Sequence, residues 1–128
     1  MKVLQNLWIM EKSGVVIFHR DFDEKIAPQM FGAMMSALNI FADHLSDGGL
    51  SNFELEDKRF TFIKKDNLIF IANSSKRFSQ KKVNKELEKV AKKFLKLYSD
   101  KLDLSNGKIG TFTEFKTEIE DALEEKTE

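Results

Sequence analysis

Residues 7–20 read LWIMEKSGVVIFHR, two apolar runs separated by a short polar segment that contains one glycine. Glycine adopts positive φ at little cost, so Glu11-Lys12-Ser13-Gly14 predicts a tight turn. Val3 to Met10 and Val15 to Arg20 are therefore expected to pair as an antiparallel hairpin. Both runs carry apolar residues on both faces of a strand, which predicts a sheet covered by helical layers on both sides.

A helix and three further strands are expected after the hairpin. Pro28 suits the first turn of a helix, and apolar residues at spacings of three and four continue to Leu45, before Asp47-Gly48-Gly49 ends the helix. Three short apolar segments follow, separated by tight polar turns, and predict an antiparallel meander. These predicted strands are Leu50 to Glu56 as an edge strand, Arg59 to Lys64, and Leu68 to Ala72 as a central strand.

Two more helices are expected in the last part of the chain. From about Gln80 to Leu102, apolar residues keep the helical spacing for about five turns. Thr111 and Glu114 match a capping box, which predicts a short final helix from about 112 to 123. Residues 124–128 are expected to fray.

The predicted order is therefore ββαβββαα within a single domain of 128 residues, of which about 3–123 are ordered. We expect an α/β sandwich, a five-stranded antiparallel sheet with one helix on one face and two on the other. The chain is too short for two independent cores and for a sheet built from many parallel βαβ units.

The composition favours a soluble cytoplasmic domain. Hydrophobic residues make up 41% of the chain, and no apolar run reaches the roughly 18 residues that a membrane span requires. The absence of cysteine excludes a disulfide framework and a thiolate zinc site. The 21 basic and 21 acidic side chains cancel, and only three of the basic residues are arginine, which disfavours nucleic-acid binding.

The sequence gives no sign of catalysis, metal or cofactor. It lacks phosphate-binding glycine loops and the nucleophile elbow of hydrolases. The two histidines, His19 and His44, have no suitably placed acidic or histidine partner, so we interpret both as structural or surface residues. We therefore expect a protein that is not an enzyme.

The predicted first helix has no charged residue between Lys25 and Asp43, although a solvated helix normally carries charges on its outer face. We assign the spaced stripe Met30, Met34, Ala37, Leu38, Phe41 and Leu45 to the core. That leaves a partner interface, most simply in a homodimer, made of Phe31, Gly32, Met35, Ser36 and Asn39. The alternative is that these extra apolar residues widen the contact of the helix with the core.

The predicted long helix is strongly basic. Residues 76–96 carry nine basic and two acidic side chains, whereas Glu114 to Glu128 carry seven acids and two lysines. These opposite charges either pair across the surface or leave a basic face for an anionic membrane or an acidic GTPase surface. The residues of that possible contact are Lys81, Lys85, Lys89, Lys92 and Lys96.

The order of the elements, the opening hairpin and the segments Met30 to Leu45 and Phe53 to Phe60 resemble longin-like domains of the longin/roadblock superfamily. Roadblock domains usually place a helix before the first strand, whereas this chain opens with Val3 to Met10. The similarity spans about residues 3 to 123 and looks most like longin-like proteins of archaea that encode small GTPases.

This resemblance implies function through contact. Such domains serve as GTPase-regulating platforms, as subunits of tethering and adaptor complexes in vesicle trafficking, and as heads of membrane-fusion proteins. The expected partners are accordingly a small GTPase or another longin or roadblock subunit, bound through the first helix and the edge of the opening hairpin. Because no SNARE-like helix follows the domain in this sequence, we do not expect the fusion-protein version. The alternative is a tethering or adaptor subunit that touches anionic membrane through its lysine-rich helix.

Overall fold

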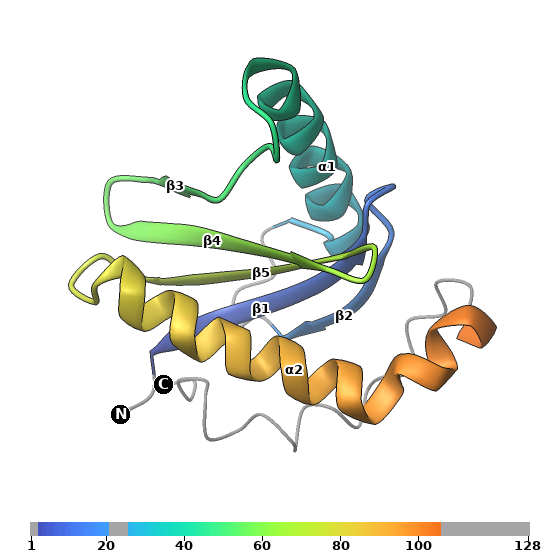
Figure 1. Cartoon of the computed structure of the whole chain (residues 1–128). Helices are drawn as coiled ribbons and strands as arrows, with labels where there is room; N and C mark the ends of the chain where they lie inside the picture. Colours follow the sequence, from blue (N-terminus) through green and yellow to red (C-terminus); the bar gives the residue numbers. More distant parts are fainter. Residues whose placement is uncertain (1–2, 21–25, 106–128) are drawn as a thin grey trace.

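The chain forms a single antiparallel sheet with helices α1 and α2 on opposite faces (Figure 1). The structure, a computed structural model, describes residues 3–20 and 26–105. In chain order, the elements are β1 (Leu4–Glu11), β2 (Val16–Arg20), α1 (Pro28–Leu45), β3 (Asn52–Glu54), β4 (Lys58–Lys65), β5 (Leu68–Ser75) and α2 (Gln80–Ser105). The predicted order of elements is confirmed, and the predicted helix at 112–123 lies outside the described residues.

The five strands are ordered β2-β1-β5-β4-β3, and every neighbouring pair is antiparallel. β5 lies in the middle of the sheet and is buried from Leu68 to Ser74, as its continuous apolar run predicts. β3 is at the edge as expected, but it covers three residues rather than the predicted seven. It is short because the chain turns immediately afterwards, where Leu55 N–H donates to Lys58 O at 2.8 Å.

Alternate residues of the central strands enter two separate cores. From β1, Leu7 and Ile9 pack on the side of α2, whereas Trp8 and Met10 pack on the side of α1. The apolar stripe of α2 completes the first core with Val83, Leu87, Val90, Ala91 and Phe94. The two apolar faces predicted for the hairpin strands are therefore both covered, because a helix packs on each side of the sheet.

α1 lies directly on the β1–β2 hairpin. Gly14 occupies the turn with φ of 101°, the left-handed conformation that glycine tolerates. Its carbonyl faces Gly32 of α1 so closely that a Cβ on Gly32 would collide with Gly14 O and would stand 2.7 Å from a methyl of Val16. Gly32 is thus the residue that lets the helix backbone approach the turn.

We predict that Gly32→Ala destabilises the domain by about 1–3 kcal/mol, because the added methyl meets backbone atoms that cannot move aside. This loss exceeds the gain of at most about 1 kcal/mol that alanine brings to a helix interior. Urea unfolding followed by the fluorescence of the single tryptophan, Trp8, measures it. Ala33→Ser at the exposed neighbouring position is the control. Equal stability of wild type and Gly32→Ala would contradict the close approach.

Candidate functional site

The structure reverses the expected faces of α1. Four of the five residues predicted to form the partner interface, Phe31, Gly32, Met35 and Ser36, are buried, and Asn39 is half-buried. The prediction that these five residues form an exposed interface is therefore wrong. The stripe that was assigned to the core lies on the outside of the helix instead.

Side chains on this inner face of α1 hold the helix to the rest of the fold. The Phe31 ring stacks on Trp8 with 4.1 Å between centroids. The Ser36 hydroxyl donates to Lys12 O at 2.8 Å, and Asn39 Oδ1 accepts from Leu50 N–H at 3.0 Å. These contacts explain why a glycine, a serine and an asparagine occupy the inner face: the backbone is close, and its polar groups need partners.

Gln29 adds a second kind of anchor at the open edge of β2. Its amide nitrogen donates to Val16 O, and its amide oxygen accepts from Val16 N–H, both at 2.9 Å. The side chain thereby pairs with the strand as a further strand would. The backbone N–H and C=O of this edge-strand residue would otherwise lack partners, and the helix supplies both hydrogen bonds.

The outer side of α1 carries an uncovered apolar surface, which we call the outward α1 stripe. Five of its members are large side chains, between 42% and 74% exposed, and the sixth is an exposed alanine. Monomeric proteins seldom leave large contiguous apolar patches in contact with water, so such a stripe indicates a contact surface. The outward α1 stripe consists of Met30, Met34, Ala37, Leu38, Phe41 and Leu45.

The second half of α1 projects beyond the sheet. All four of its buried residues fall between Phe31 and Ser36, and Figure 1 shows the helix standing away from the strands beyond that point. Lys64 of β4 supports the loop that follows by donating to Gly48 O. Partial burial lowers the pKa of Lys64 below its ordinary value, an effect that the nearby Asp43 carboxylate opposes. Phe41 and Leu45 therefore stand on a helix end that is tethered but not covered.

The five lysines predicted as an anionic contact are all exposed on α2 and form a lysine stripe opposite its buried apolar residues. Lys89 approaches Glu86 at 3.6 Å, and the other acid of this helix segment, Glu88, pairs with Lys65 of β4 at 2.5 Å. Among the described residues, the other four lysines of the stripe have no ion-pair partner. The stripe consists of Lys81, Lys85, Lys89, Lys92 and Lys96.

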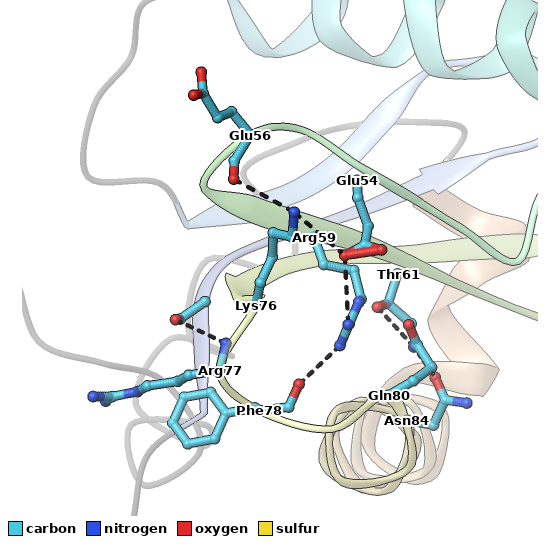
Figure 2. A network of polar contacts seen from close by, with 10 residues as sticks. Glu54, Glu56, Arg59, Thr61, Lys76, Arg77, Phe78, Gln80 and Asn84 are labelled. Atoms are coloured by element: carbon cyan, nitrogen blue, oxygen red, sulfur yellow. Dashed lines mark hydrogen bonds and ion pairs between the residues drawn. The ribbon is translucent and has the colours of Figure 1, made fainter.

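Other basic residues near the start of α2 serve the fold instead. Figure 2 shows Arg59 of β4 donating to Phe78 O, at 2.8 Å, and approaching Glu54 at 3.5 Å. Lys76 also approaches Glu54, at 3.8 Å, and donates to Glu56 O. The network fastens the β3–β4 hairpin to the turn before α2. Sequence reasoning counted Lys76 with the basic surface, because its acidic partner lies 22 positions away along the chain.

The two histidines lie on different elements of the fold. His44 is exposed, with Nδ1 2.8 Å from Ile40 O of the same helix, and His19 is half-buried on β2. Within the described ranges no group of three or more acidic, histidine or cysteine residues could hold a metal ion. No helix in the described part of the chain is long and apolar enough to cross a membrane.

Substitutions at two adjacent positions distinguish the buried face of α1 from its exposed face. Met34 is 47% exposed and Met35 is 6% exposed. Met35→Glu is expected to cost about 3 kcal/mol or more, because a carboxylate would replace a thioether in the core. Met34→Glu should stay within about 0.5 kcal/mol of wild type. Thermal unfolding of both variants in dilute solution tests this, and a larger loss for Met34→Glu would restore the predicted assignment of the faces.

The family of the chain is shown by a family model described as the first longin domain of FUZ, MON1 and HPS1, which matches residues 5–108. The chain belongs to this family, which confirms the resemblance to longin-like domains. The likeness to archaeal proteins stays a prediction. No curated protein matches the chain by sequence.

Solved structures support the same fold. Myxococcus xanthus MglB has a TM-score of 0.60 at 13% sequence identity, and the match covers 76% of this chain and 85% of that one. The Roadblock/LC7 domain from Streptomyces avermitilis has a TM-score of 0.58 at 12% identity, with 72% and 82% covered. At such low identity these likenesses show the fold and leave the function to be argued from the surfaces.

Proposed function

We propose that this longin domain is a non-catalytic protein-interaction module that binds its partner through the outward α1 stripe. One observation carries the proposal: the helix has an apolar, uncharged side that the fold leaves uncovered. Methionine and leucine side chains adapt to different partner shapes, and their removal from water favours association. Of the opening hairpin, whose edge the sequence also indicates for this contact, Val15 is an exposed large apolar residue, at 37%, that is not part of the stripe.

We further propose that the partner is a small GTPase or another longin or roadblock subunit, met in the cytoplasm. Membership of the longin family supports this choice, and so does the fold that the chain shares with roadblock domains. Regulation of a GTPase or assembly of a trafficking-like complex are the two activities that such a partner implies.

Placing a charge on the outward α1 stripe should weaken partner capture. Phe41 is 65% exposed, so Phe41→Glu is expected to leave the fold intact and to reduce capture at least tenfold, because a charge would enter an apolar contact. The measurement is a pull-down from lysate of the source cells with GDP or a non-hydrolysable GTP analogue, followed by mass spectrometry.

Lys12→Glu on the exposed hairpin turn is the matched control, since Lys12 is not a member of the outward α1 stripe. A small GTPase retained in one nucleotide state supports the regulator. Recovery of longin or roadblock relatives without a GTPase supports a structural subunit. Equal capture by wild type and Phe41→Glu would remove the outward α1 stripe from the function.

A second candidate function is contact with an anionic membrane through the lysine stripe. Five lysines project from one side of α2, and each lysine near an anionic surface contributes about 1 kcal/mol to binding. The alternative that the sequence leaves open is that the acidic segment Glu114 to Glu128 of the same chain neutralises these charges.

Reversal of one stripe charge should weaken such membrane contact. Lys85→Glu is expected to reduce co-sedimentation with phosphatidylserine-containing vesicles by roughly tenfold or more, whereas Lys12→Glu should change it little. Binding should also fall as salt concentration rises. Co-sedimentation that does not depend on the anionic lipid content of the vesicles would eliminate this candidate.

A further inference from the structure

The α1–β3 loop, residues 46–51, joins the projecting half of α1 to the sheet. On the basis of the function proposed above, we propose that Lys64 of β4 is a positioning residue for the outward α1 stripe. By holding this loop, Lys64 keeps the projecting half of α1 in the orientation in which the stripe meets its partner. Lys64 itself lies on β4 and is not a member of the stripe.

The projecting half of α1 needs a support because it is long. Ser36 is the last of the buried residues of the helix, and nine residues follow to Leu45, which corresponds to about 13 Å of helix. A tilt of about 10° at Ser36 would therefore move the end of the helix by about 2 Å. Apolar contacts lose about a quarter to a half of their attraction when a gap of roughly 0.5–1 Å opens. A displacement of that size would remove Phe41 and Leu45 from a partner.

Two side chains of α1 hold the loop from the side of the helix. Asp43 Oδ1 accepts a hydrogen bond from Gly48 N–H at 3.2 Å, and Asn39 Oδ1 accepts one from Leu50 N–H at 3.0 Å. Both side chains belong to the projecting half of α1. These bonds make the loop and the end of the helix one unit, so whatever holds the loop also orients the helix.

Two groups of β4 hold the same loop from the side of the sheet. Phe62 N–H donates to Ser51 O at 2.9 Å, and Lys64 Nζ donates to Gly48 O. Ser51 adjoins β3, so the bond from Phe62 continues the pairing of β3 with β4. Gly48 lies in the middle of the loop and is bonded to α1 through its N–H. The bond from Lys64 to its carbonyl therefore links the sheet to the end of the helix.

Gly49 shows how closely the loop fits between helix and sheet. A Cβ at this position would stand 2.5 Å from Asn39 Oδ1 and 2.9 Å from Lys64 Nζ, both closer than real Cβ atoms approach other atoms. Its φ of 70° also suits glycine. Asn39 and Lys64 thus confine the loop backbone from two elements. A surface that is confined before binding loses less conformational entropy when a partner docks, which raises its affinity.

Hydrogen exchange of the full chain tests whether Lys64 holds the loop. Lys64→Met keeps a long side chain but removes the donor, and the amides of Gly48 and Leu50 should exchange about tenfold faster, as expected for the loss of one hydrogen bond from a charged group. Lys64→Arg keeps a cationic donor and should restore the protection. Lys65→Met is the matched control and should exchange as wild type does, because Lys65 pairs with Glu88 of α2 on the other face of the sheet.

Partner capture tests whether this support matters for binding. In the pull-down described above, Lys64→Met should retain about fivefold less of the GTPase or of the longin or roadblock subunit that wild type captures, although the outward α1 stripe is unchanged. Lys64→Arg should recover the capture, which a role of the lysine in general stability alone would not predict. Lys65→Met should capture as much as wild type.

Unchanged exchange in Lys64→Met would overturn Lys64 as the residue that holds the loop. Faster exchange together with full capture would overturn its role in binding, and would leave the proposed function standing if Phe41→Glu still loses capture. Full capture by Phe41→Glu as well would overturn both the proposed function and the positioning role that rests on it.

Discussion

Two glycines meet where α1 crosses the β1–β2 hairpin, and the arrangement of the α1 layer depends on this contact. Because Gly32 has no Cβ, the backbone of α1 packs directly against the turn at Gly14. At that separation Ser36 reaches a turn carbonyl and Gln29 reaches the backbone of the edge strand. The first turns of α1 are thereby fixed in position, and the rest of the helix continues in the direction that they impose.

That direction explains why one helix has a packed beginning and an uncovered end. The core on the α1 side of the sheet is continued beyond the helix by stacked rings, with Phe31 on Trp8 and Phe60 on Phe53 at 4.9 Å. These rings cover the face of the sheet that the overhanging half of α1 does not reach. The sheet is therefore sealed without help from Phe41 or Leu45, so these two side chains are not required by the core of the monomer.

The strands, apart from the length of β3, and the positions of the two described helices were predictable from the sequence because apolar periodicity and turn residues act locally. The orientation of α2 was predictable as well, since lysines and large apolar residues separate cleanly on its two sides. The orientation of α1 was not predictable in this way, because both of its sides are uncharged and the side with more large apolar residues is the outer one. A signal was present: a glycine in a helix interior costs about 1 kcal/mol relative to alanine, so Gly32 marked the side of closest packing.

The two surfaces lie on opposite sides of one sheet and respond to conditions differently. Burial of the outward α1 stripe depends on apolar area, which ordinary salt affects little. The lysine stripe acts through charge, and its attraction is screened over about 10 Å at 0.1 M salt. Because β1 and β5 lie between α1 and α2, a partner on one stripe does not cover the other. The two proposed contacts are therefore compatible within one domain, a protein on α1 and an acidic surface on α2, and a single salt titration distinguishes them.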